Sequence, residues 1–335
     1  MDYNIPVPKQ SRLAFWAIKD KSIQHAGLVF ERFAPDTKDD SKLKEDGLQA
    51  VLKAYGDSRK PNEGKEKLFK AWNARWEGVV RAAGAEPFTL KTDWRLIAGL
   101  GKKGSLEVGF TFHRYGFPYL PGSSLKGLAR AYGLLEIALG LESAIKSKNQ
   151  KEPLSKLDEI LSCEDAERFE EDIRTYQPKD DLLQVAKAFR LVFGTTDTAG
   201  KVVFFDAIPS EIPKLEMDIM NPHYPDYYKE GSKEYPTNWQ NPIPVKFLTV
   251  ASGSAFRFAI GWRGAPEDGK PDAEKKQTKF SWWKGDQIEK IKGQAPDDHP
   301  RMLKLARRWL QGGLLELGAG AKTSAGYGYF LETKQ

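Results

Sequence analysis

The sequence is poorest in the residues that build disulfides and membrane spans. It contains a single cysteine, Cys163, which excludes an internal disulfide and cannot hold a zinc ion alone. No run approaches the ~20 consecutive apolar residues that cross a bilayer. The first ten residues, MDYNIPVPKQ, lack the apolar core of a signal peptide. These absences disfavour secreted and membrane-spanning classes, so we expect a cytoplasmic protein.

Histidine is also scarce, and its positions exclude the common metal motifs. The four histidines are scattered along the chain, and none has a spacing such as HxxxH; they are His25, His113, His223 and His299. We therefore predict no metal site and no cofactor.

Aromatic residues and basic charge are what the sequence has in quantity. Aromatic residues make up 12% of the chain, including nine Trp, which excludes a disordered protein. Residues 142–181 carry 12 acidic and 7 basic side chains, a net charge of −5. Since the whole chain has a net charge of +6, the other 295 residues carry a net charge of +11. A basic body with one acidic region suits an anionic partner on one face, although an ordinary solvated surface has the same composition.

The N-terminal region, residues 1–87, has helical periodicity. Ser22 is a candidate cap for a helix that reaches Phe33. A second helix is predicted from Lys65 to Ala83, ending before Gly84. Its expected buried stripe consists of Leu68, Trp72, Trp76, Val79 and Val80. Its basic residues are expected to face outward; they are Lys65, Lys70, Arg75 and Arg81.

After residue 87 the apolar period changes to two. The tracts 88–98 and 106–113 alternate in this way, and Gly101-Lys102-Lys103-Gly104 between them predicts a hairpin. The apolar face of the first tract is expected to contain Phe88, Leu90, Trp94, Leu96 and Ala98.

The rest of the chain predicts an α+β protein. Further helices are expected at 124–139, within 142–190 and at 300–317, further strands at 201–206, 245–250, 255–262 and 327–331, and a surface loop at 264–298. Without insertions, the order is strand, helix, strand, strand, helix, strand. This is the ferredoxin-like (RRM-like) order, with an antiparallel sheet, two helices on one face and an open face that many modules use for RNA.

The segment PYLPGSSLKG, residues 118–127, predicts the start of a helix. Ser123 or Ser124 would cap it, and Lys126 would lie in the first turn. Free backbone N–H groups at a helix start attract anions, so the segment suits an RNA phosphate. A plain helix cap is the alternative.

The segment GAGAKTSAGYGYF, residues 318–330, is a second candidate phosphate loop. Its glycines let the backbone approach a phosphate closely. It is not a Walker A loop, because Ala321 precedes the lysine and a strand pattern follows; nor is it GxGxxG, because position 323 is Thr. A structural turn without a ligand is the alternative.

Four tracts in order resemble the RAMP superfamily of CRISPR proteins. Three are PGSSLKG, VFGTTDTAGKVVFFDA and GAGAKTSAGYGYF. The fourth, MDIMNPHYPDYY followed by PTNWQNPIPVKFLTV, resembles one branch, the sixth subunit of the type III-B Cmr RNA-targeting complex. The resemblance covers residues 88–331.

The resemblance implies a single RAMP domain over residues 1–335. Its ferredoxin-like core would comprise 88–141 and 191–332, with a helical insertion at 142–190 and a thumb-like insertion at 215–240. Such a subunit would be non-catalytic. It would cap a filament near the 3′ part of the crRNA and support guide–target duplex formation in antiviral defence. Its partners would be crRNA, target RNA, the other Cmr-complex RAMP subunits and the small helical subunit, so it would not act as a free monomer.

The resemblance also implies which residues contact RNA. At the helix start these are Ser123, Ser124 and Lys126, and in the Gly-rich loop they are Gly318, Gly320, Lys322, Thr323, Ser324, Gly326 and Gly328. We add His113, Arg114 and Arg130 as expected RNA contacts nearby. In the thumb, Tyr224 and Trp239 either stack on bases or pack the insertion against the core, and His223 either contacts RNA or shapes a turn. The rival hypothesis is a metal-independent endoribonuclease that processes guide RNA with His113 as its base, since some RAMP proteins are nucleases.

Overall fold

A computed structural model describes residues 25–34, 41–101, 108–140, 153–176, 180–221, 244–263 and 299–332, with single positions 8, 10, 106, 227, 231, 233 and 235. The helices are α2 (Ala26–Leu28), α3 (Ser41–Tyr55), α4 (Glu63–Ala82), α5 (Gly122–Gly140), α7 (Pro153–Ser162), α8 (Ala166–Tyr176), α9 (Asp180–Phe193) and α10 (His299–Gly312). The strands are β1 (Glu86–Thr92), β2 (Val202–Phe204), β3 (Ile208–Pro209), β4 (Leu215–Met220), β5 (Val245–Val250), β6 (Ala255–Trp262) and β7 (Phe330–Glu332). Two π-helical turns, η1 (Val29–Phe33) and η4 (Gly313–Leu317), and one 3₁₀ turn, η5 (Thr323–Ala325), complete the described elements.

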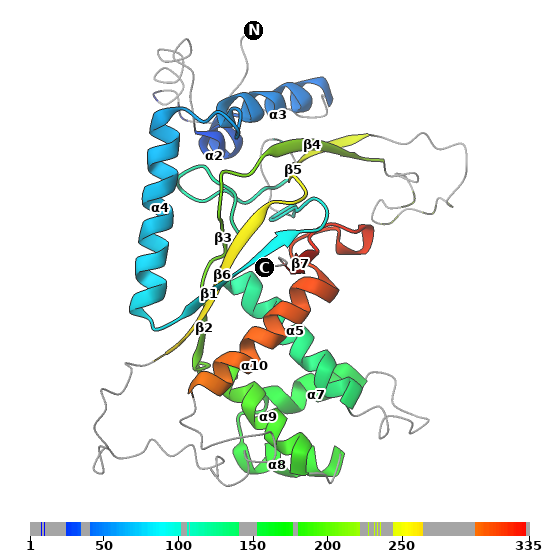
Figure 1. Cartoon of the computed structure of the whole chain (residues 1–335). Helices are drawn as coiled ribbons and strands as arrows, with labels where there is room; N and C mark the ends of the chain where they lie inside the picture. The colour runs from blue at the N-terminus through cyan, green and yellow to red at the C-terminus, as the bar shows by residue number, and fades with distance from the viewer. Residues whose placement is uncertain are drawn as a thin grey trace.

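The larger sheet has the strand order β2-β6-β1-β7, and each neighbouring pair is antiparallel. A further short strand of this sheet, β3, also pairs with β6 and is antiparallel to it. Helices α5 and α10 pack against each other and cover one face of the sheet (Figure 1). Under them Phe88 stacks on Phe258 with ring centroids 5.4 Å apart, and the fully buried Trp309 of α10 contacts Phe193. The fold is therefore α+β with antiparallel sheets.

Helix α4 covers part of the opposite face. Side chains alternate along a strand, so Arg257 of β6 points away from its buried neighbours Phe256 and Phe258. Its guanidinium bonds Glu77 and Asn73 of α4. It also lies 5.0 Å from the ring centroid of Trp76. The prediction of an open sheet face is therefore wrong where α4 lies, because the order of core strands says nothing about an N-terminal helix.

The α4 helix itself was predicted, but its buried stripe differs. Asn62 caps it by accepting a hydrogen bond from the amide of Lys65 at 2.8 Å. Phe69, Trp72, Trp76 and Val80 are buried. Leu68 and Val79, predicted to be buried, are exposed, since the packed stripe is narrower than the apolar one. Lys65 does not face outward: it bonds the carbonyl of Tyr55 and lies over that ring, and burial lowers its pKa to about 8.

At the N-terminus, His25 rather than Ser22 caps the first described helix. Its Nδ1 accepts a hydrogen bond from the amide of Leu28 at 3.0 Å, and its Nε2 contacts the carbonyl of Arg114. Ser22 lies outside the described residues.

The predicted hairpin between 88–98 and 106–113 is wrong. β1 ends at Thr92 and pairs with β6 and β7 instead. Residues 108–112 are all buried and form no strand ladder within the described chain. Their backbone pairing consists of an isolated bridge from Phe112 to Pro118 and a hydrogen bond from the amide of Gly109 to the carbonyl of Leu100 at 2.9 Å. Trp94, expected on the buried face, is 48% exposed, because the chain bends after β1. The turn residues 102–105 lie outside the described residues.

Strands β4 and β5 form a separate two-stranded antiparallel ribbon, in register from Leu215↔Val250 to Met220↔Val245. The strand predicted at 245–250 is therefore confirmed, and it pairs outside the larger sheet. The ribbon lies at the end of the molecule opposite α8 (Figure 1).

The helices predicted within 142–190 are present from residue 153 as α7, α8 and α9. They are joined to the core, since Phe189 and Phe193 of α9 contact Trp309. Residues 141–152 and the loop predicted at 264–298 lie outside the described residues. The last strand is Phe330–Glu332, later than the predicted 327–331. No helix in the described part of the chain has the length and apolar character needed to span a bilayer.

Candidate nucleic-acid interface

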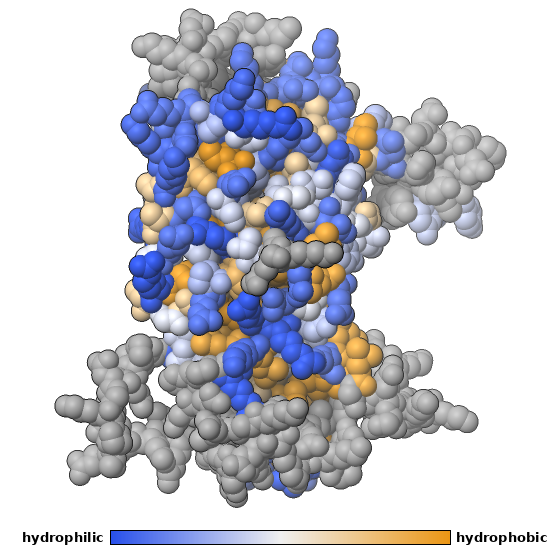
Figure 2. All heavy atoms as spheres, in the orientation of Figure 1, coloured by the Kyte–Doolittle hydropathy of each residue, from blue (hydrophilic) through white to orange (hydrophobic). Residues whose placement is uncertain are grey.

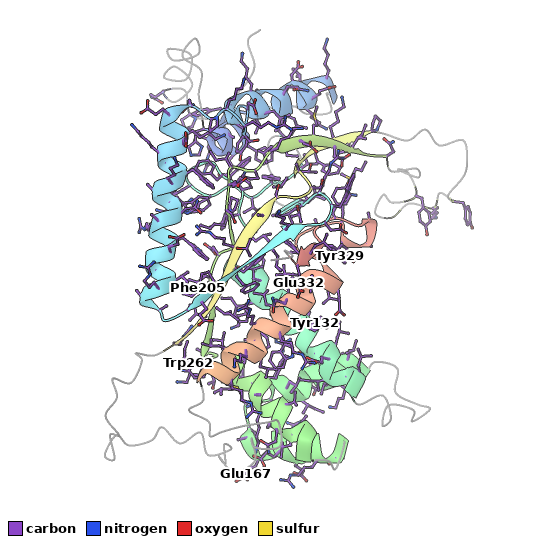
Figure 3. All side chains as sticks on the ribbon, viewed as in Figure 1. Tyr132, Glu167, Phe205, Trp262, Tyr329 and Glu332 are labelled. Carbon is purple, nitrogen blue, oxygen red and sulfur yellow. The ribbon has the colours of Figure 1, made fainter. Side chains whose placement is uncertain are left out.

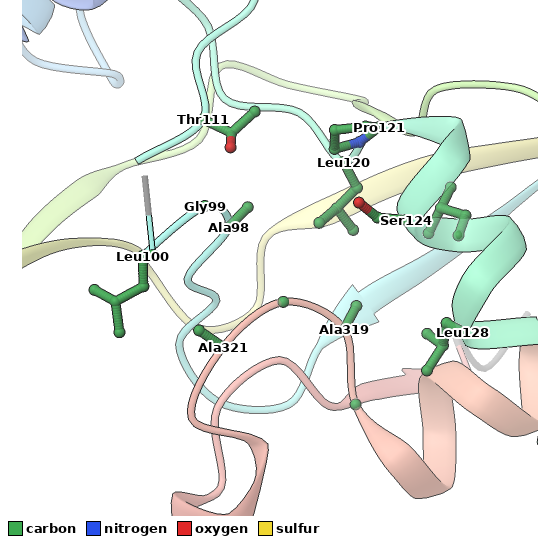
Figure 4. A pocket seen from close by; sticks show the side chains of 14 residues that line it. Ala98, Gly99, Leu100, Thr111, Leu120, Pro121, Ser124, Leu128, Ala319 and Ala321 are labelled. Carbon is green, nitrogen blue, oxygen red and sulfur yellow. The ribbon is translucent and has the colours of Figure 1, made fainter. Parts of the chain in front are cut away.

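Four segments of the chain line one pocket of about 500 Å³ (Figure 4). They are residues 98–101 after β1, Thr111, residues between 120 and 128 at the start of α5, and residues 318–321 of the Gly-rich loop. Ser124, Gly318 and Gly320, predicted as RNA-binding residues, all lie on its wall. The structure thus brings together the two loops that the sequence predicts separately as phosphate sites.

The Gly-rich loop is shaped by glycines with φ between +78° and +89°: Gly318, Gly320, Gly326 and Gly328. A Cβ at Gly320 would collide with the carbonyl oxygen of Ile97, and one at Gly328 with that of Ala319. These two positions are needed to pack the loop. At Gly326 a Cβ would meet nothing within 4 Å, so only its backbone conformation favours glycine.

Lys322 departs from the glycine pattern of its loop. It has φ +59° and is the only non-glycine residue with positive φ in the described chain. The left-handed conformation costs a side-chain-bearing residue about 1–2 kcal/mol. Strain of this kind gathers at functional sites.

The backbone around Lys322 leaves amide groups available. Lys322 precedes the 3₁₀ turn η5, and within the described chain the amides of Lys322, Thr323 and Ser324 have no protein acceptor. Successive free amides in a turn form an anion-binding concavity. The Lys322 ammonium lies 5.9 Å from the Phe247 ring centroid on β5, beside this turn.

The start of α5 differs from the prediction. The helix begins at Gly122, whose amide donates to Oδ1 of Asp206 at 2.7 Å. Ser123 and Ser124 are exposed residues of the first turn and not its cap. A carboxylate therefore occupies part of the position where a phosphate was predicted. The sequence offered one signal for Asp206, its place directly after the buried strand VVFF.

Lys126 and Arg130 differ in what surrounds them. Burial lowers the pKa of Lys126, and the charges of Arg263 and Arg130 lower it further, so cations gather here. Arg130 is engaged with the insertion, because it pairs with Asp158 at 2.6 Å and bonds Ser162 at 3.1 Å. Lys126 therefore lies among like charges, whereas Arg130 is paired with an acid.

His113 lies in an aromatic cluster and not on the polar face of a strand. Its ring stacks on Trp72 of α4 with centroids 4.5 Å apart. Its Nδ1 faces the amide of Tyr115, at 3.4 Å. Burial lowers the pKa of His113, and Arg114 lowers it further. Arg114 is exposed in the adjoining turn, so of this predicted pair Arg114 is the residue that faces solvent.

Arg95, which the sequence analysis overlooked, joins the β4–β5 ribbon to the Gly-rich loop. Its guanidinium pairs with Asp218 at 2.6 Å and Glu216 at 3.1 Å. Asp218 accepts a further hydrogen bond from the hydroxyl of Tyr327 at 2.7 Å. Burial and this hydrogen bond raise the pKa of Tyr327 to about 12. The ribbon and the loop are therefore held as one unit.

The predicted thumb residues His223, Tyr224 and Trp239 lie outside the described residues, beyond the ribbon. Two other tyrosines of that segment, Tyr227 and Tyr235, are exposed. Within the described residues, no group of three His, Cys, Asp or Glu side chains could hold a metal ion.

Helix α10 carries exposed basic residues, and the insertion that contains the acidic helix α8 packs against it through α9. Lys304 and Arg308 of this helix are exposed, and Arg308 pairs with Glu136. Figure 2 shows hydrophilic side chains gathered over the region where Figure 1 places α10. Tyr132 of α5 donates to Glu316 at 2.9 Å, whereas Glu167 marks the acidic helix α8 at the far end (Figure 3). The side chains that line the pocket are themselves uncharged.

Comparison with known proteins identifies the family. The model of the RAMP superfamily matches residues 87–331. The CRISPR system Cmr subunit Cmr6 of Pyrococcus furiosus is 33% identical over 290 residues, which cover 79% of this chain and 73% of that protein.

Two solved structures are also similar. The crystal structure of Cmr6 from Pyrococcus furiosus aligns with 75% of this chain and 98% of its own, at 30% identity and a TM-score of 0.41. A cryo-EM structure of the type III-B Cmr-β complex bound to cognate target RNA contains a chain that aligns with 89% of this chain and 76% of its own, at 19% identity and a TM-score of 0.47. On the superfamily match and the sequence identity to the archaeal subunit, the chain belongs to the RAMP superfamily and is a homologue of Cmr6.

Proposed function

We propose that this chain is a non-catalytic, RNA-binding subunit of a type III-B CRISPR effector complex. It caps the filament near the 3′ part of the crRNA and supports pairing of guide with target. Its partners are crRNA, target RNA, the other RAMP subunits and the small helical subunit. Homology to Cmr6, a subunit of a CRISPR Cmr system, supports this proposal.

The geometry of the loop around Lys322 is the observation that best supports RNA binding. One short segment, residues 318–324, contains a strained lysine and three free amides and forms one wall of the 500 Å³ pocket. RNA phosphate is the ligand that such a loop suits in a basic protein, because amides and an ammonium together complement its oxygens. Near the start of α5, Lys126 and Arg263 supply a second cluster of positive charge.

The core fold agrees with this role. We propose that β1, α5, β2, β6, α10 and β7 form a ferredoxin-like module, since they follow one another in that order and the sheet order is β2-β6-β1-β7. The β4–β5 ribbon is the base of the thumb, which packs against the guide–target duplex.

The experiment is RNA binding by the full chain across a range of salt concentrations. Phosphate contacts displace counterions, so the affinity should fall steeply as salt rises and depend little on sequence. Lys322→Ala should reduce the salt slope by about one unit without changing sequence preference. An affinity that is flat from low to physiological salt would contradict the proposal.

Absence of catalysis is tested on the same protein. The full chain is incubated with guide precursor and target RNA, with and without magnesium. We expect no specific cleavage. Specific cleavage that disappears in His113→Ala would favour the endoribonuclease instead, with the stacked His113 as its base.

A further inference from the structure

Trp94 is placed differently from the other tryptophans that the structure describes. Its side chain is 48% exposed, whereas Trp72, Trp76 and Trp309 are at most 8% exposed. Trp262, the remaining described tryptophan, is half-buried. The alternating pattern of residues 88–98 predicts Trp94 on the buried face. A single exposed apolar side chain is common on protein surfaces, so what sets this indole apart is how the backbone and Arg95 hold it. Trp is also among the residues enriched at interfaces.

The backbone under Trp94 is rigidly held. Six backbone hydrogen bonds of 2.8–3.0 Å tie Thr92, Asp93, Arg95 and Leu96 to segments on both sides. On one side the partners are residues 250–254, and on the other Gly328 and Tyr329 of the Gly-rich loop (Tyr329 is labelled in Figure 3). The exposed indole is thus presented by a fixed backbone, which lowers the entropy that binding would lose.

The ring is also oriented from one side. The Arg95 guanidinium lies 5.1 Å from the Trp94 ring centroid, within the range of a cation–π contact. Arg95 is in turn fixed by Asp218 and Glu216 of β4. The Trp94 ring therefore has an oriented surface beside the ribbon, and its backbone is joined through Gly328 to the loop that carries Lys322.

We infer that Trp94 is a stacking platform for one unpaired nucleobase of the bound RNA strand, positioned by Arg95. This inference rests on the proposed RNA-binding function and adds a contact to a base where the loop contacts phosphate. Stacking on an aromatic ring is tolerant of sequence, because every base has a π face. A contact to a neighbouring protein subunit is the competing use of an exposed tryptophan. The bonded connection to the Gly-rich loop favours RNA.

The test uses the full chain and unstructured single-stranded RNA. Trp94→Ala should weaken binding about 5- to 150-fold, the usual effect of removing one base–aromatic stack. Trp94→Phe should restore most of the affinity, whereas Trp94→Leu should not, since leucine is apolar but has no π face. The salt slope should stay that of the parent protein in all three variants, because no phosphate contact is removed.

A second readout reports stacking directly. RNA with 2-aminopurine placed at successive positions should show quenched fluorescence at one position on binding, and Trp94→Ala should lose that quenching. Circular dichroism and thermal unfolding check that the variants fold, which the exposed position makes expected.

The outcomes separate the two proposals. If the parent protein binds no RNA, the proposed function fails, and this inference with it. If RNA binds the parent and Trp94→Ala equally, with the same quenching, the stacking platform is overturned while RNA binding stands. If Trp94→Ala leaves RNA binding intact but prevents assembly with the purified partner subunits, Trp94 belongs to a protein interface and the inference is likewise overturned.

Discussion

The start of α5 and the Gly-rich loop are similar in sequence but satisfy their backbone amides differently. Both combine glycine, serine and lysine, and both line the same pocket. At α5 the first amide donates to the carboxylate of Asp206, whereas the amides of residues 322–324 have no acceptor in the described chain. Similar glycine- and serine-rich tracts therefore differ in the amides that they leave free for a ligand, because distant residues decide which amides are already bonded.

The largest expected effect separates glycines that pack the loop from a glycine that only turns it. Gly328→Ala should lower the free energy of unfolding by about 2–5 kcal/mol, since a left-handed side chain would also overlap the Ala319 carbonyl. At residue 326 a Cβ would meet nothing within 4 Å, so Gly326→Ala should lower the free energy of unfolding only by the strain of a left-handed backbone, about 1–2 kcal/mol. Chemical unfolding of both variants measures the difference. Equal losses would show that the loop relaxes around a Cβ at residue 328.

The second prediction changes the cap that distinguishes the two loops. Asp206→Asn keeps an oxygen acceptor for Gly122 but removes the negative charge at the helix start. RNA affinity at low salt should then rise about 2- to 5-fold, the effect of one charge at a helix terminus. Asp206→Ala is the control for stability, since it removes the cap and should lower the free energy of unfolding by about 1 kcal/mol. An unchanged affinity in Asp206→Asn would show that RNA does not approach the start of α5.

The third prediction concerns the ion pairs that join the ribbon to the loop. The hydrogen bond from Lys214, with Lys214 and Arg95 nearby, lowers the pKa of Glu216 despite some burial. Burial alone would raise the pKa of Asp218, but hydrogen bonds from Tyr327, the backbone and Arg95 outweigh it and lower that pKa.

Because both folded pKa values lie below the ordinary 4.5 of Glu and 3.8 of Asp, the stabilisation is present above those values and is lost as the pH falls below them. Arg95→Gln should therefore reduce the loss of stability on acidification. The measurement is the unfolding midpoint from about pH 6 to about pH 3. The same acid dependence in parent and variant would remove Arg95 from this account.

Local pattern predicted the elements well where each is decided by its own residues. Helix α4 follows from its apolar stripe and Asn62, and strands β5 and β6 follow from their apolar runs. Pairing was harder, because the partner of a strand is set by the whole chain. Residues 108–112 look like a strand since they are apolar, yet they are buried without a ladder, and β5 pairs with β4 outside the larger sheet.

The candidate site shows the same division. The glycines, Lys322 and Ser124 were found from local sequence, because turn chemistry is local. Asp206, Arg95 and the exposure of Trp94 were not, since each depends on contacts between segments distant in the sequence. The surroundings of His113 were also not predicted, because the Trp72 ring that stacks on it belongs to an N-terminal helix.

The measurement that tests the central claim most directly is made on Lys322→Gly. Glycine accepts φ +59° without strain, so the variant should be more stable than the parent by about 1 kcal/mol. It should nevertheless bind RNA more weakly, with a salt slope smaller by about one unit, because one phosphate contact is gone. Paired unfolding and salt-dependent binding measurements give both quantities on the same protein. If Lys322→Gly is more stable and binds RNA with the affinity and salt slope of the parent, the loop is a structural turn and the account is contradicted.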